Sequence, residues 1–295
     1  MVMQGILFLT NMPLCAGAKS PVVIHLPADS LQIVFLANVN ANFENCHCGE
    51  HPLGGLDRVI TVVNQWRRQN PHLLLIDGGD FLNAYPYPAL NRMILHLYRL
   101  LRPDMLSLGD QELQKGNIEF QDEIFNGAFR FLNSNISVGK FPLEKEMAIR
   151  LKSHNITILS YLDPSSFLWE KPAQNVQINM ASFEQSYRRS LADKNFRIVI
   201  FHGEQDRLKA FIKTHGKVHL ILLAHAQVRT SKTNSLPYIL GVGTDSEYLI
   251  RISLKFNSGK SYPELWVKSL PIELTIKPDS SARQIIEEFK TQSQR

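Results

Sequence analysis

Short apolar runs alternate with amphipathic helical patterns along most of the chain, and this alternation constrains the fold more than any other feature. The runs are bounded by Gly, Asn, Asp or Pro, which is typical of strands. Apolar side chains recur at helical spacing from Leu56 to Trp66, which predicts a first helix. The pattern predicts an α/β domain built in layers. Predicted strands cover residues 33–37, 73–76, 105–108, 129–132, 156–161, 197–201, 218–223, 238–242 and 248–256, further helices cover 88–101, 183–192 and 208–215, and hairpins cover 243–270.

The size and charge of the chain indicate a globular protein. It has 295 residues, of which 44% are hydrophobic, and no internal repeat or low-complexity linker divides it. Such a chain can bury a substantial core. The net charge of +5 comes from 32 basic and 27 acidic residues that are spread along the sequence. Because no dense basic block is present, we expect no nucleic-acid partner.

The first 18 residues resemble a secretory signal peptide. An apolar run is followed by Ala16-Gly17-Ala18, a small-x-small pattern that predicts cleavage before Lys19, although a buried N-terminal strand is the alternative. No other segment approaches the roughly 18 apolar residues of a membrane span. We therefore expect residues 19–295 to form a single domain that is periplasmic or extracellular.

Polar side chains that can act as ligands follow four of the predicted strands. Asp80 follows strand 73–76, Asp110 follows strand 105–108, and two histidines, His202 and His225, follow strands 197–201 and 218–223. Proteins of the α/β class place their ligands at the carboxyl ends of strands. One such residue is usually structural, but an ordered series of oxygen and nitrogen donors at strand ends is unlikely to be accidental.

The series resembles the calcineurin-like metallophosphatases. With the helix entry Gly54-Gly55-Leu56-Asp57-Arg58 it looks most like the N-terminal domain of the periplasmic 5′-nucleotidase branch, which reads D-x-H, GGL-x-R, GD, GNHE, a strand-end H, and GH-x-H. The resemblance covers roughly residues 33 to 242. It implies a layered sandwich of two mixed β-sheets flanked by helices, with two metal sites that share Asp80.

The resemblance implies that one of these metal sites is retained. This site would consist of Asp80, Asp110, His202 and His225, with Asp110 at a position where the family has asparagine. Two carboxylates and two imidazoles suit one divalent transition metal, either zinc, manganese or iron.

The other implied site departs from the family pattern. Its ligands would be Asn38, Asn40, Asp80 and Gln227. Three neutral amides supply neither full charge nor the imidazole nitrogens that such metals favour. We expect this second site to be vacated, so that the active site is degraded.

Catalysis is also in doubt, because Gln111 stands where the family's GNHE histidine donates a proton to the leaving group. We expect a catalytically weak or inactive protein that serves as a binding or assembly module, with an envelope protein or a small phosphorylated ligand as partner. The alternative is a single-metal phosphoesterase. The chain stops at a helical pattern over 280–295, where the family's nucleoside-binding domain would begin, so we expect no nucleotide cofactor.

A polar loop near Asn38 carries two cysteines and two histidines: Cys46, His47, Cys48 and His51. The cysteines could form a strained C-x-C disulfide or remain free thiols. The four side chains could instead bind zinc or copper. A redox or docking role is a third possibility, and it would make the chain a redox-linked envelope protein. Without a C-x-x-C-H motif, we expect no covalent haem.

Overall fold

The computed structural model describes residues 22–45, 52–168, 170–192, 195–260 and 262–293. Two predictions lie outside these residues. They concern the cleavage of residues 1–18 before Lys19, and the chemistry of Cys46, His47, Cys48 and His51.

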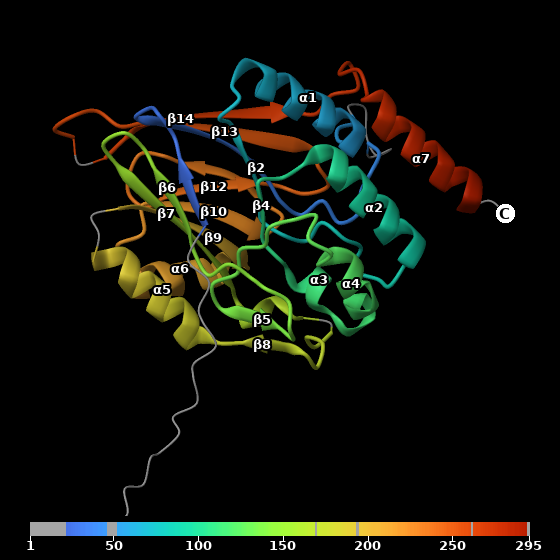
Figure 1. Cartoon of the computed structure of the whole chain (residues 1–295), viewed down its shortest axis with the longest axis horizontal. Coiled ribbons are helices and arrows are strands. Elements are labelled where there is room, and N and C mark those ends of the chain that lie inside the picture. The colour runs from blue at the N-terminus through green and yellow to red at the C-terminus, as the bar shows by residue number, and fades with distance from the viewer. Residues whose placement is uncertain (1–21, 46–51, 169, 193–194, 261, 294–295) are drawn as a thin grey trace, which may run out of the picture.

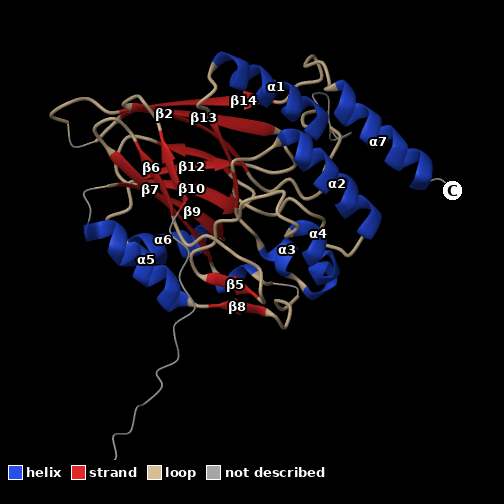
Figure 2. Cartoon of the chain, in the orientation of Figure 1, coloured by secondary structure: helices blue, strands red, loops and turns tan. Residues whose placement is uncertain are grey.

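Two mixed β-sheets lie face to face between two layers of helices (Figures 1 and 2). The seven-stranded sheet has the order β1 (Val22–His25), β6 (Met147–Arg150), β7 (Asn155–Leu162), β9 (Phe196–Gly203), β10 (Leu220–His225), β12 (Tyr238–Val242) and β11 (Arg229–Lys232). The five-stranded sheet has the order β14 (Glu264–Pro271), β13 (Tyr248–Lys255), β2 (Ser30–Leu36), β3 (Leu74–Asp77) and β4 (Met105–Leu106). A small separate sheet pairs β5 (Ile136–Val138) with β8 (Val176–Ile178).

The central strands of both sheets are parallel, which brings their carboxyl ends to common edges. β2, β3 and β4 run parallel in one sheet, and β7, β9, β10 and β12 run parallel in the other. His202 on β9 lies opposite Ala224 on β10. The next residue along β10, His225, therefore ends its strand beside His202.

Alternate side chains of each strand face different layers, as the two-residue period of a strand requires. Ile33 and Phe35 of β2 pack between the sheets with Ile198 of β9, whereas Val34 and Leu36 face the helices. The helices over the five-stranded sheet are α1 (Leu56–Gln69), α2 (Pro88–Leu101) and α7 (Ser280–Ser293). Those over the seven-stranded sheet are α5 (Met180–Ala192) and α6 (Gln205–Thr214). Short helices α3 (Asp110–Leu113), η1 (Lys115–Phe120), α4 (Gln121–Ile124) and η2 (Pro164–Ser166) complete the chain.

The layered α/β architecture predicted from the sequence is confirmed, and most of its elements are present. Residues 88–101 and 238–242 form α2 and β12 with the predicted bounds. The strand predicted at 129–132 is wrong, because only isolated bridges form there, at Phe131 and Leu132. None of the helices in the described parts of the chain is long and apolar enough to cross a membrane.

Candidate metal centre

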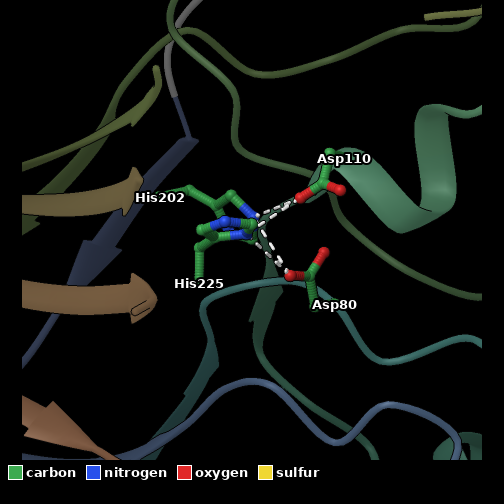
Figure 3. Close-up of side chains that lie close together, drawn as sticks. All are labelled: Asp80, Asp110, His202 and His225. Carbon is green, nitrogen blue, oxygen red and sulfur yellow. Dashed lines mark hydrogen bonds and ion pairs between the residues drawn. The ribbon is translucent and has the colours of Figure 1, made fainter. Parts of the chain in front are cut away.

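Four side chains from both sheets converge at one point, as the sequence predicts (Figure 3). Asp80 follows β3, and Asp110 begins α3 three residues after β4, so the carboxylates lie at the end of the five-stranded sheet. His202 is the last residue but one of β9, and His225 ends β10, both in the other sheet. One potential ligand atom from each residue lies within 4.8 Å of all the others. The folded chain thus assembles two carboxylates and two imidazoles around one small volume.

Each imidazole directs one ring nitrogen at both carboxylates. His202 Nε2 lies 3.3 Å from Asp80 Oδ2 and 3.2 Å from Asp110 Oδ1. His225 Nδ1 lies 3.3 Å and 3.0 Å from the same two oxygens. All four atoms therefore face inward, and this donor set fits a divalent transition metal.

The outer nitrogens of the two imidazoles have their own partners. His202 Nδ1 is 3.0 Å from the carbonyl oxygen of Gly78, to which it donates, so that Nε2 can offer its lone pair to the centre. His225 Nε2 is 3.3 Å from Glu204 Oε1. A histidine that binds a metal through one nitrogen usually donates from the other to a carbonyl or carboxylate. Both histidines have this arrangement.

The cluster is strongly coupled electrostatically. Burial by itself raises the pKa of Asp80, but the charges and hydrogen bonds of His202 and His225 hold this pKa well below its usual value. Burial lowers the pKa of His225, and hydrogen bonds to Asp110 and Asp80 outweigh it and raise the pKa to about 9. The metal-free centre is therefore a network of ion pairs, and metal binding would release protons from the imidazoles.

The backbone around the centre is unusually tight. A Cβ at Gly109 would lie 2.1 Å from Asp80 Oδ1 and 2.4 Å from His202 Cε1, so no other residue fits there. Asp80 and His225 have φ angles of 57° and 63°, in the left-handed region that side chains rarely adopt. Such conformations cost about 1–3 kcal/mol and cluster at functional sites.

Glu112 holds the turn that carries Asp80, a role that the sequence pattern did not identify. Its Oε2 accepts hydrogen bonds from the N–H groups of Asp80 (3.0 Å) and Gly109 (2.8 Å). Its Oε1 accepts from Phe81 (2.8 Å) and Leu82 (2.9 Å). Burial and the neighbouring Asp80 charge raise the pKa of Glu112 to about 8, while hydrogen bonds from the backbone oppose the rise. Glu112 thereby fixes the Asp80 turn against the start of α3.

Two residues of the site expected to be vacated, Asn38 and Asn40, form hydrogen bonds with other parts of the protein. Asn38 Oδ1 accepts from the N–H of His225 at 2.7 Å, and its Nδ2 donates to the Gly243 carbonyl at 2.8 Å. Asn40 Nδ2 donates to Thr244 Oγ1 at 2.8 Å and to Asp245 Oδ1 at 3.0 Å. These contacts connect both asparagines to the loop after β12.

Gln111 and Gln227 differ in their surroundings. Gln111 Nε2 donates to Asn40 Oδ1 at 2.8 Å, and the Gln111 N–H is 3.2 Å from Asp80 Oδ1. Gln227 is exposed, two residues beyond His225. The structure thus places Gln111 beside both Asp80 and Asn40.

Comparisons with known proteins find relatives by sequence, although no protein-family model matches the chain. The sequence is 27% identical over 168 residues to Protein 5NUC of Lutzomyia longipalpis, a match that covers 53% of this chain and 29% of that protein. It is 28% identical over 116 residues to the 5′-nucleotidase of Homo sapiens, covering 38% of this chain and 20% of that protein.

Solved structures share the fold at lower sequence identity. The 5′-nucleotidase precursor from Thermus thermophilus superposes with a TM-score of 0.73 at 14% identity, covering 90% of this chain and 59% of that one. The calcineurin-like phosphoesterase YfkN from Bacillus subtilis gives a TM-score of 0.66 at 16% identity, covering 90% and 98%. The sequence matches described above span less than a third of the length of Protein 5NUC and of the Homo sapiens 5′-nucleotidase.

Proposed function

We propose that this chain, which has the calcineurin-like phosphoesterase fold and resembles the N-terminal domain of the 5′-nucleotidases, binds one divalent transition metal and hydrolyses phosphoesters weakly or not at all. The protein would serve as a binding or assembly module for a small phosphorylated ligand or an envelope protein. The module would act in the periplasm or outside the cell. In support of export, residues 1–18 have the pattern of a signal peptide.

One observation supports this proposal above the others. The four donors of the candidate centre face one another within 4.8 Å, while Gln111 Nε2 donates a hydrogen bond to Asn40 Oδ1 at 2.8 Å. The first arrangement favours one bound ion. The second leaves no titrating group at positions 40 and 111, where the family pattern has histidines.

Each residue of the centre would have a defined task. Asp80, Asp110, His202 and His225 would hold the ion, which when bound would act as a Lewis acid towards a phosphoryl oxygen. Gly78 and Glu204 would orient the imidazoles through their outer nitrogens. Gln111 can donate a hydrogen bond but cannot transfer a proton near neutral pH. Binding of a phosphoryl group is therefore better supported than its hydrolysis.

The alternative, a single-metal phosphoesterase, is favoured by the complete donor set and by Glu204, which lies at the edge of the centre. The side chain of Glu204 is 44% exposed and contacts His225. One ion can still lower the pKa of a water molecule and promote slow hydrolysis.

Metal analysis combined with a phosphodiesterase assay distinguishes these functions. We expect the purified protein, supplemented with manganese or zinc, to hold at most one ion per chain. We expect turnover of bis-nitrophenyl phosphate to remain far below the typical enzyme median of roughly 10 per second. Turnover within about tenfold of that median, lost in Asp80→Ala, would establish the phosphoesterase and refute the weak or inactive protein. Two ions per wild-type chain would refute the single-ion site.

The redox-linked alternative depends on Cys46 and Cys48. Titration of free thiols before and after mild reduction tests it directly. We expect no change in metal content between the two states, because the four donors of the candidate centre include no cysteine.

A further inference from the structure

A cleft lies at the end of the seven-stranded sheet opposite to the candidate metal centre. Its volume is about 270 Å³, and we call it the basal cleft. Arg197 and His202 lie on the same strand, β9, five residues apart. At about 3.3 Å per residue, roughly 16 Å separate them. The residues of the basal cleft that carry the argument are Phe196, Arg197, Lys217, His219, Phe256 and Tyr262.

Arg197 is a buried cation without an acidic partner. It is only 8% exposed, and its guanidinium donates to the carbonyls of Lys217 (Nε, 2.7 Å) and Ser190 (Nη1, 3.1 Å). The remaining nitrogen, Nη2, lies 3.2 Å from His219 Nε2. Within the described residues no carboxylate forms an ion pair with it. Carbonyl groups satisfy hydrogen bonds but do not neutralise the charge, and a buried charge without a counter-charge is costly.

The other polar residues of the basal cleft do not supply the missing negative charge. Lys217 is exposed and adds a second cation. Burial and the charge of Arg197 lower the pKa of His219 to about 4, so this imidazole is neutral near pH 7. The basal cleft thus has a positive potential that favours an anion.

Aromatic rings form a continuous wall beside these cations. Phe196 stacks on His219 with ring centres 5.0 Å apart, and His219 is 5.4 Å from Tyr262. Phe256 meets Phe196 edge to face at 5.7 Å. Tyr262 is 46% exposed, so part of this wall faces solvent. An aromatic wall offers a stacking surface to a planar apolar group.

We propose that the basal cleft binds a small organic anion, with its phosphonate, phosphate or carboxylate group at Arg197 and Lys217 and an apolar ring against the aromatic wall. The guanidinium has five N–H donors, of which two are engaged with carbonyls, so a bidentate contact remains open. The volume lies near the lower limit for small-molecule pockets, which suits one ring and one anionic group.

Calorimetric titration of the full chain with phenylphosphonate tests the proposal. A chelator in the buffer keeps the metal centre free of ions, and inorganic phosphate serves as the comparison ligand. We expect phenylphosphonate to bind at one site, and phosphate to bind at least about tenfold more weakly, because the ring buries apolar area. Absence of phenylphosphonate binding at millimolar concentrations would refute the proposal. Equal affinity for phosphate would refute it too, since the aromatic wall would then contribute nothing.

Two exposed positions locate the ligand without disturbing the buried arginine. Lys217→Gln should weaken binding about two- to fivefold, as expected for a partly solvated ion pair. Lys213→Gln on α6, an exposed lysine that does not line the basal cleft, should leave binding unchanged. Equal effects of the two substitutions would show a general charge effect and would refute the site. Loss of binding in Asp80→Ala would place the ligand at the metal centre instead, and would equally refute it.

Discussion

Gln111 donates from Nε2 to Oδ1 of Asn40 over 2.8 Å, so two of the three residues that replace histidines of the family pattern are bonded to each other. The pair is neutral, and Gln111 Oε1 is buried without a hydrogen-bond partner among the described residues. Histidine at position 40 alone would lose this partner without gaining a complete metal site. The asparagine at position 40 and the glutamine at position 111 are therefore chemically linked.

Restoring the family ligands should create a second metal site. The triple variant Asn38→Asp, Asn40→His and Gln227→His should bind about one more ion per chain, because carboxylate and imidazole replace neutral amides. Without metal, we expect this variant to be less stable than the wild type. Position 38 would then direct a carboxylate oxygen at the Gly243 carbonyl, to which Asn38 Nδ2 now donates. Metal analysis and thermal unfolding with and without manganese measure both effects, and an unchanged ion content would contradict the ligand assignment.

Removing Asp80 should abolish metal binding, whereas removing Asn40 should not. Asp80 Oδ2 faces both imidazoles, whereas the Asn40 amide is hydrogen-bonded to Asn38, Thr244, Asp245 and Gln111. Asp80→Ala and Asn40→Ala are compared by metal content after dialysis against zinc. Equal metal loss in the two variants would mean that Asn40 belongs to the site.

Glu112→Gln should destabilise the protein by about 2–4 kcal/mol. The amide nitrogen of glutamine cannot accept the two backbone hydrogen bonds that one Glu112 oxygen receives, and each buried unsatisfied donor costs about 1–3 kcal/mol. Urea unfolding measures the change. Glu287→Gln on α7, where the side chain is 53% exposed, is the matched control and should change stability by less than about 0.5 kcal/mol.

His219 should make the fold sensitive to acid. Its pKa in the folded protein is lowered to about 4 from an ordinary value of 6.5, because it is buried beside Arg197. The unfolded chain therefore binds the proton first, and stability should fall as pH drops from about 6.5 towards 4. His219→Asn keeps an acceptor for the Arg197 N–H but does not titrate, so it should reduce this loss. Urea midpoints at pH 7.5, 5.5 and 4.5 show the effect, and the exposed His96→Asn should behave like the wild type.

The exported protein should begin at or near Lys19. Intact-mass analysis of material secreted by the native host measures this directly. Retention of Met1 would contradict the signal-peptide assignment, which depends on Ala16-Gly17-Ala18 after an apolar run.

Features that depend on local sequence could be predicted. Helix α2 and strand β12 have the predicted bounds because their apolar periodicity coincides with burial in the core. The parallel strands of each sheet bring two donors to one edge, and the resemblance to the metallophosphatases implied that the two pairs form one set.

Features that depend on distant partners could not be predicted. Glu112 reaches the backbone of Asp80 across 32 positions, and Gln111 reaches Asn40 across 71, so no spacing in the sequence indicates either contact. Strand β1 is half exposed and pairs in parallel with β6, over one hundred positions away, so its own sequence carries little signal. The segment 129–132 has the composition of a strand but forms only single bridges, to Leu106 and Glu144.

The origin of the four donors from two sheets has a mechanical consequence. Asp80 and Asp110 belong to one sheet and His202 and His225 to the other, and apolar packing joins the sheets behind them. An ion held by all four side chains would link the two sheets at the edge of the sandwich, through two ligands from each sheet. Sliding or splaying of one sheet against the other would then have to break coordination bonds as well as apolar contacts. The metal occupancy of the centre would therefore indicate how tightly the two sheets are held together.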